Sequence, residues 1–140
     1  MNIEPKEANE VGLLHLIQQS GGIHSRIRLQ KLVCIAMFKF GKKIAPFSFS
    51  FKSHFYGPYS EELRNTIDLM VLNGLVSEAA IPSETGSSYF YGITEVGKER
   101  LNSANKKLAS CLTLIDAVIS EFGNASSSSI IQSAKTLSGL

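Results

Sequence analysis

The segment between residues 60 and 93 constrains the fold of this chain more than any other part. It begins as a helix that Ser60 can cap at its N-terminus, and Asn73-Gly74 ends that helix. The apolar residues of the helix recur at helical spacing, and they are Leu63, Ile67, Met70 and Val71. Two short strand-like runs follow, Leu75 to Ala79 and Tyr89 to Ile93, with turn-forming residues between them. We therefore expect a helix that leads directly into a β-hairpin with a long tip.

Two helices and a strand are expected before this segment. Helical periodicity extends from Glu7 to Gln19 and from Ser25 to Phe40, and glycine follows each stretch. The stretch from Phe47 to Phe55 instead alternates between apolar and polar residues. This alternation predicts a strand that presents four aromatic side chains on one face, namely Phe47, Phe49, Phe51 and Phe55.

A long helix is expected after the hairpin, from Thr94 to Phe122, and a short one from Ile130 to Leu137. Apolar residues in the long helix keep spacings of three and four. Such a seam can pack the helix onto the first two helices, or it can join two subunits. We favour a homodimer, and the residues expected to form its contact are Leu101, Leu108, Cys111, Ile115, Val118 and Phe122.

The order helix, helix, strand, helix, strand, strand and helix is typical of a winged helix-turn-helix, in which the hairpin is the wing. The expected fold class is therefore α+β, mostly α, with a C-terminal helical extension that mediates dimerisation. Residues 1–94 are expected to form the winged-helix domain, with the wing at about residues 75–93, and residues 95–140 the extension.

Short motifs in this chain are similar to those of a known family. Leu29-Gln30-Lys31-Leu32 in the second helix and Tyr56-Gly57-Pro58-Tyr59-Ser60 before the third resemble the YwgA-like family of uncharacterised prokaryotic proteins. Gly74-Leu75-Val76 and the stretch from Tyr91 to Lys98 are similar to the same family. The more distant Panacea antitoxin domain has a similar pairing of the first two motifs. The resemblance implies a winged-helix protein, and its Panacea branch implies an antitoxin-like partner.

The formal net charge of +2 conceals an uneven distribution of charged residues. No acidic residue lies between Glu10 and Glu61, whereas seven basic residues do. The remaining residues carry seven basic and twelve acidic side chains. Helical geometry places the basic residues of the second helix within an arc of ~80°, and these are Arg28, Lys31, Lys39 and Lys42. We therefore expect a basic ridge, which is either a solvated helix face or a surface for DNA phosphates.

Two functions fit these features. The first is a DNA-binding transcription regulator, and the residues expected to contact phosphates of double-stranded DNA are Arg26, Arg28, Lys31, Lys39, Lys42, Lys43, Lys52 and Arg64. Glu61, Glu62 and Asp68 on the third helix oppose this function because they would face the same phosphates. The wing tip opposes it as well, since it contains Glu84 and no Lys or Arg. The second function is a protein-interaction module on the winged-helix scaffold, such as an antitoxin-like partner-binding protein.

Catalytic and targeting signatures are absent from the sequence. It contains no Gly-rich phosphate loop, no Gly-x-Ser-x-Gly and no Cys-x-x-Cys, and its histidines are scattered. We therefore expect no enzyme activity, no cofactor and no metal site, and we expect Cys34 and Cys111 to be reduced core residues. The N-terminus lacks a signal-peptide pattern, and the most apolar run, Cys111 to Ile119, is too short to span a bilayer. The predicted location is the cytoplasm, without membrane contact.

Overall fold

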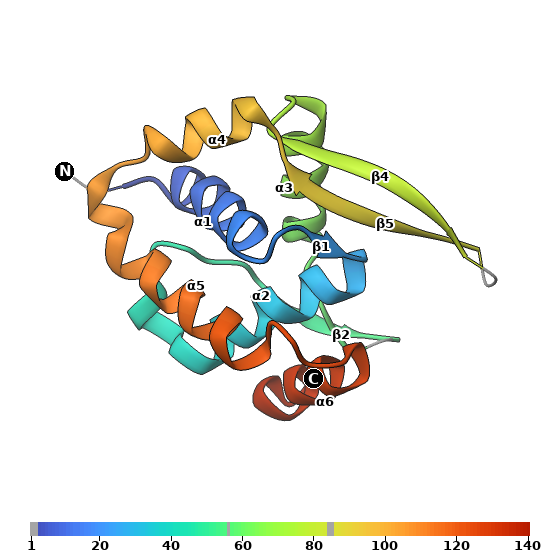
Figure 1. Cartoon of the computed structure of the whole chain (residues 1–140). Coiled ribbons are helices and arrows are strands. Elements are labelled where there is room, and N and C mark those ends of the chain that lie inside the picture. The colour runs from blue at the N-terminus through green and yellow to red at the C-terminus, as the bar shows by residue number, and fades with distance from the viewer. Residues whose placement is uncertain (1–2, 56, 84–85) are drawn as a thin grey trace.

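The computed structural model describes residues 3–55, 57–83 and 86–140, and it shows an α+β protein that is mostly helical (Figure 1). The helices are α1 (Pro5–Gln19), α2 (Arg26–Phe40), α3 (Glu61–Leu72), α4 (Glu95–Asn102), α5 (Ala109–Phe122) and α6 (Ser127–Ser138). The 3₁₀ turns are η1 (Gly41–Ile44) and η2 (Lys106–Leu108). The strands are β1 (Ile23–His24), β2 (Lys52–His54), β3 (Gly57–Tyr59), β4 (Val76–Ser83) and β5 (Gly86–Ile93). The predicted fold class, α+β and mostly α, is confirmed.

Serine caps define the starts of α2 and α3, and the cap at Ser60 was predicted from the sequence. Ser25 Oγ accepts a hydrogen bond from the Arg28 backbone N–H at 3.1 Å. Ser60 Oγ accepts one from the Leu63 backbone N–H at 3.0 Å. Each oxygen satisfies one of the N–H groups that the first helical turn leaves without an intrahelical partner.

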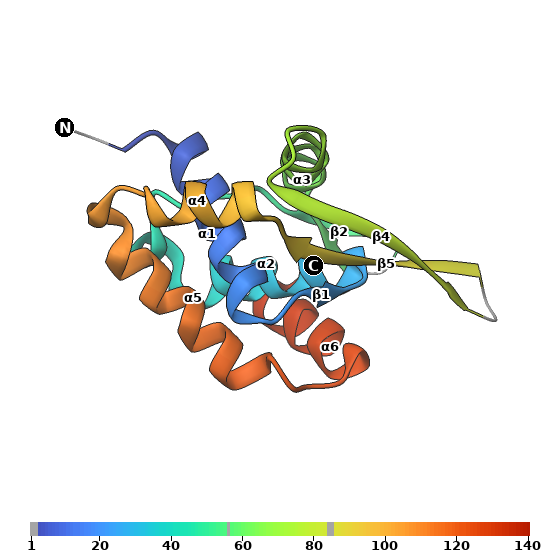
Figure 2. The same cartoon turned by 45° about the horizontal axis from the view of Figure 1, so that its top comes forward.

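The larger sheet is antiparallel and has the strand order β1-β5-β4. Its strands β4 and β5 form the predicted hairpin, which projects from the body of the molecule (Figures 1 and 2). The prediction of a long hairpin tip is wrong, because strand pairing continues as far as Ser83 and Gly86. Pro82 does not prevent this pairing because β4 is the edge strand, where proline is tolerated.

Helix α1 lies at the centre of the core, in contact with α4, α5 and β5 (Figure 2). Its residues Val11, Leu14 and Ile17 are fully buried. A Cβ atom on Gly12 would lie only 2.4 Å from Phe47 Cδ1, so the Phe47 ring packs directly on the backbone of α1. The segment that contains Phe47, which follows η1, therefore packs directly against α1 in the core.

The predicted strand from Phe47 to Phe55 is only partly correct. Phe47 and Phe49 are buried as expected, but the chain pairs with another strand only in β2, after this apolar stretch. The Asn9 side chain takes the place of a strand partner, since its Nδ2 donates to Ser48 O at 2.9 Å and its Oδ1 accepts from Ser48 N at 2.8 Å. Phe55 does not share the buried face, because it lies in the turn after β2 and is 93% exposed.

The single long helix predicted from Thr94 to Phe122 is interrupted. Helix α4 ends at Asn102, and Asn105 Oδ1 then accepts the Lys107 N–H at 2.9 Å to start η2. The chain turns at this break, and α5 packs on α1 and α2. The break separates the predicted seam into two helices whose directions differ (Figure 1).

The residues predicted to form a dimer contact lie in the core of their own chain. Leu108, Cys111, Ile115 and Val118 are buried, and Leu101 and Phe122 are partly buried against the same core. The seam therefore packs onto the chain itself, which is the first of the two alternatives that its spacing allows. A homodimer stays a prediction, and it requires a different surface.

The C-terminal helix α6 begins three residues earlier than predicted. Ser126 Oγ accepts the Ser129 N–H at 3.2 Å and so caps the helix. Ile130 and Ala134 are buried where α6 packs on α2, and α6 also contacts β3. The last helix of the chain thus covers the second.

Candidate functional site

The two sequence motifs meet in the interior of the protein. Gln30 Nε2 donates to Ser60 O at 2.8 Å, and Gln30 Oε1 accepts from Ser60 N at 2.8 Å. Lys31 Nζ donates to Pro58 O at 2.6 Å. All these contacts join side chains of α2 to the backbone that leads from β3 into α3. We call this set of residues, Gln30, Lys31, Pro58 and Ser60, the motif junction.

Lys31 is the least expected member of the motif junction, because its side chain was predicted to contact DNA. The residue is only 2% exposed. Burial lowers the pKa of the Lys31 amine below its ordinary value, and the nearby charge of Lys135 acts in the same direction. The predicted phosphate contact at Lys31 is therefore wrong.

Helix α6 covers the motif junction. Gly57 has a φ of 96°, and a Cβ atom there would lie 3.0 Å from Lys135 Cε. The aliphatic part of Lys135 consequently lies against the backbone of the Tyr-Gly-Pro-Tyr-Ser motif, where glycine is required by both conformation and space. Tyr56 of this motif lies outside the described residues.

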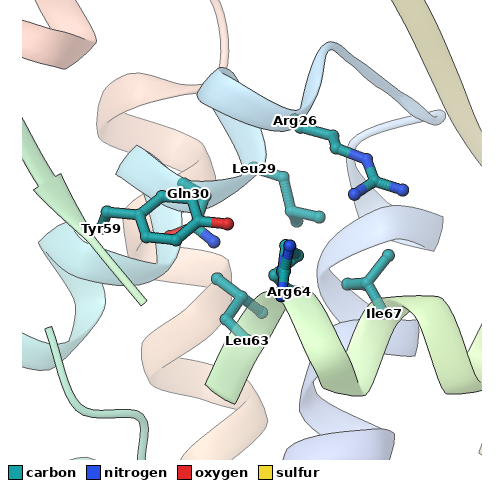
Figure 3. Close-up of a pocket in the computed structure, with 7 residues that line it drawn as sticks. All are labelled: Arg26, Leu29, Gln30, Tyr59, Leu63, Arg64 and Ile67. Carbon is teal, nitrogen blue, oxygen red and sulfur yellow. The ribbon is translucent and has the colours of Figure 1, made fainter. Parts of the chain in front are cut away.

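A pocket beside the motif junction separates α2 from α3 (Figure 3). It is lined by Arg26, Leu29, Gln30, Tyr59, Leu63, Arg64 and Ile67. Its volume of about 30 Å³ is enough for about one water molecule. This pocket is therefore too small to bind a substrate.

Arg26 joins α2, α3 and the hairpin through its guanidinium group. Its Nη2 contacts Asp68 Oδ1 at 2.8 Å and Glu78 Oε2 at 2.7 Å, and its Nε donates to the Tyr91 hydroxyl. The Tyr91 hydroxyl in turn donates to Glu78 Oε2 at 2.6 Å. The hydrogen bond from Arg26 is the main cause that lowers the pKa of Glu78, and the hydrogen bond from Tyr91 adds to it. Burial is the main cause that raises the pKa of Tyr91. These partners already occupy the Arg26 guanidinium, so the predicted phosphate contact at Arg26 would have to displace them.

The predicted basic ridge on α2 is not continuous, because Lys31 is buried and Arg28 is half-buried, whereas Lys39 and Lys42 are exposed. Arg28 donates to the carbonyl oxygens of Ala125 at 2.9 Å and Gly123 at 2.8 Å, which form the turn between α5 and α6. Lys39 Nζ contacts Glu121 Oε1 at 2.7 Å and lies 5.8 Å from the centre of the Phe122 ring. The C-terminal helices thus pack on the ridge and engage its cations.

The other predicted phosphate contacts are exposed. Lys42 and Lys43 lie on η1, and Lys52 begins β2. Arg64 is exposed on α3, where its Nη2 lies 3.7 Å from Glu61 Oε1. The structure does not bring these four residues together with Arg28 and Lys31 as one continuous surface.

The outer side of α3 presents apolar side chains that sequence analysis overlooked. Leu69 is 55% exposed and Leu72 is 79% exposed, and they lie three residues apart on one side of the helix. Val96, in the first turn of α4, is 53% exposed. Thr94 Oγ1 donates to Gly74 O at 2.6 Å and so holds the start of α4 against the end of α3. We call the surface formed by Leu69, Leu72 and Val96 the α3–α4 face.

The sequence pattern of α3 could have predicted that Leu69 and Leu72 are exposed. Leu63, Ile67 and Met70 complete the buried stripe of α3, so Leu69 and Leu72 fall outside it. Large apolar residues that fall outside the buried stripe of a short helix are exposed unless another element covers them.

Within the described residues, His, Cys, Asp and Glu side chains form no group of three or more that could hold a metal ion. In the same part of the chain, none of the helices combines the length and the apolar character needed to cross a membrane. Cys34 and Cys111 are free thiols in the core, and burial raises the pKa of each to about 11.

The fold and the motif junction define a class of protein, namely small, mostly helical α+β proteins in which a Leu-Gln-Lys-Leu segment holds a Tyr-Gly-Pro-Tyr-Ser segment. No family model matches the sequence. The uncharacterized protein YwgA of Bacillus subtilis (strain 168) is 32% identical to it over 125 residues, which are 89% of this chain and 70% of that protein. The chain belongs to the YwgA family, as the motifs predicted. The more distant similarity to the Panacea domain stays a prediction.

Proposed function

We propose that this protein is a protein-interaction module built on a winged-helix scaffold, and that the α3–α4 face is its binding surface. The scaffold is supported by the succession α1, β1, α2, α3, β4 and β5 together with the sheet order β1-β5-β4. The observation that carries the proposal is the exposure of Leu69 and Leu72 on α3, the helix that would enter the major groove in a DNA-binding winged helix.

The charges around α3 favour a protein over DNA. Glu61 and Glu62 occupy the first turn of α3, and Asp68 lies further along it. These carboxylates would repel the phosphates that a groove-reading helix has to approach. The described parts of the hairpin, 76–83 and 86–93, contain Glu78 and no Lys or Arg. Glu84 lies outside the described residues.

Site-specific photo-crosslinking in the native host tests the proposal. A photoreactive residue in place of Leu72 is expected to capture a discrete protein adduct, and the second substitution Leu69→Asp should abolish it. The matched control places the same residue at Phe55, which is more exposed but lies on the turn after β2. Absence of a protein adduct at position 72, or equal adducts at both positions, would refute the proposed function.

DNA binding is the second candidate, because a winged-helix scaffold with exposed Lys42, Lys43 and Lys52 retains phosphate-binding groups. A mobility-shift titration with mixed genomic DNA separates the two candidates. The interaction module is expected to leave the DNA unshifted at low salt. A shift that disappears when the three lysines are changed to Glu, and remains in Leu72→Asp, would favour the regulator instead. That the chain is not an enzyme stays a prediction.

A further inference from the structure

We infer that the segment bound by the α3–α4 face is a basic amphipathic helix of another protein. This inference rests on the proposed function and specifies its partner. The occupant has to supply an apolar stripe for Leu69, Leu72 and Val96 and positive charges for the acids around them.

The apolar part of the face has the dimensions of a helix contact. Leu69 and Leu72 lie about 5–6 Å apart along one side of α3, and Val96 continues the surface onto α4. The Thr94 N–H donates to Leu75 O at 3.2 Å, and this hydrogen bond adds to the one between Thr94 Oγ1 and Gly74 O. Because these two hydrogen bonds fix the start of α4 at the end of α3, Val96 is held near the end of the helix that carries Leu69 and Leu72, and an amphipathic helix that binds here would meet exposed apolar side chains from both elements.

The charged residues around this surface select a basic partner. Together α3 and α4 carry five acidic and three basic side chains. Arg100 is turned away from the face, because its Nε donates to Glu10 Oε1 on α1 at 2.8 Å. The side chains of Glu61, Asp68 and Glu95 are 60%, 49% and 86% exposed, and each also forms an ion pair within the chain, with Arg64, Arg26 and Lys98 respectively. Such exposed pairs are weak, so a basic partner can compete for these carboxylates. Complementary positive charge on the partner would raise the association rate and orient the bound helix.

The C-terminal helices of a second copy of this chain are poor occupants of the face. Helix α5 carries no basic residue, and α6 carries only Lys135. Lys135 is already placed along Gly57 within its own chain. Neither C-terminal helix therefore offers the basic amphipathic surface that the face requires.

Three synthetic peptides of about five helical turns test the inference by fluorescence anisotropy. The probe peptide has a leucine stripe at helical spacing with lysines on both sides of it. One comparison peptide replaces the lysines with glutamates, and the other has the probe's composition in scrambled order. We expect the probe to bind at least roughly tenfold more tightly than either comparison peptide, with an affinity that falls as salt is added.

Variants of the protein then locate the binding site. Leu72→Asp is expected to weaken probe binding by at least roughly tenfold, whereas Phe55→Ser should leave it unchanged. Equal binding of the glutamate peptide, binding that survives Leu72→Asp, or no binding would overturn the inference. Self-association of the free chain that Leu72→Asp abolishes would also overturn it, because a second copy would then occupy the face. Failure with the peptides while Leu72 still crosslinks to a protein would refute the basic helix alone and leave the proposed function intact.

Discussion

The substitution Gln30→Met tests whether the motif junction holds the fold together. Methionine keeps nearly the same length and volume, so the change removes both hydrogen bonds to Ser60 without opening a large cavity. The Ser60 N–H then loses its partner in a position that is 1% exposed. Ser60 O keeps a second hydrogen bond, from the Arg64 N–H at 3.2 Å. The variant therefore leaves one buried donor unsatisfied and removes a second, less costly bond.

The magnitude follows from these two losses. A buried donor without a partner costs about 1–3 kcal/mol, and the loss of one further neutral hydrogen bond costs about 1 kcal/mol. We expect Gln30→Met to lower the free energy of unfolding by about 2–4 kcal/mol. In a chain of 140 residues this lowers Tm by about 10 °C.

Urea unfolding followed by circular dichroism measures the change, and Gln132→Met is its matched control. Gln132 is exposed on α6, and its Nε2 lies 3.4 Å from Thr136 Oγ1, so its loss should change the unfolding free energy by less than about 0.5 kcal/mol. Equal stability of the two variants would show that the contacts between α2 and Ser60 do not stabilise the fold and would refute the reasoning.

Three further predictions concern other contacts. Arg26→Met removes hydrogen bonds to Asp68, Glu78 and Tyr91, and it should lower the unfolding free energy by about 1–2 kcal/mol and speed amide exchange in β4. Gly97→Ala should destabilise by about 2 kcal/mol or more, because the new Cβ would lie 2.2 Å from Leu75 O. The third prediction is that the free energy of unfolding falls as pH rises from about 9 toward 11. In the folded chain the thiols of Cys34 and Cys111 have a pKa of about 11, so over this range they keep protons that the thiols of the unfolded chain lose. In urea titrations with reductant, the double variant Cys34→Ala, Cys111→Ala should lose less stability over this range.

Each of these predictions has its own control. Arg64→Met removes an exposed contact of 3.7 Å and should cost less than about 0.5 kcal/mol, so equal effects at Arg26 and Arg64 would contradict the first. Lys98→Ala is the control for Gly97→Ala, because it removes only an exposed ion pair with Glu95 at 3.2 Å and should have a small effect. Equal effects of the two substitutions would contradict the second prediction. The double cysteine variant keeps Tyr91. If its free energy of unfolding falls with rising pH as steeply as that of the natural chain, groups other than the thiols cause the effect.

Local patterns predicted the helices well because their determinants lie within a few residues. The caps at Ser25 and Ser60 act three positions away, and the side chain of Thr94 likewise accepts the Gly97 N–H at 2.9 Å. Gly97, by contrast, lies within the predicted helix for a reason that local sequence does not show. It allows α4 to approach the backbone of Leu75 closely.

Patterns that depend on distant partners were interpreted less well. The alternation from Phe47 to Phe51 correctly predicts an extended segment with one buried side, but it contains no information about pairing. Asn9, which satisfies the backbone of Ser48, is separated from it by 39 positions. The same limit applies to the seam between Leu101 and Phe122, because its spacing of three and four continues through the break between α4 and α5.

The position of the C-terminal helices also determines which surfaces are available for binding. Sequence spacing places the cations of α2 on one side of a helix, but the partners of Arg28 and Lys39 lie 82 or more positions away in α5 and in the turn after it. When α5 and α6 pack there, they engage Arg28 and Lys39 on the basic side of α2, while Leu69 and Leu72 of α3 and Val96 of α4 stay exposed. Two of the cations that contribute to the net charge of +2, Arg28 and Lys31, are engaged by backbone carbonyl oxygens of the chain itself and are less available to DNA phosphates. We expect a truncation before α6 to expose Lys31, because α6 packs on α2 and β3 where this side chain is buried.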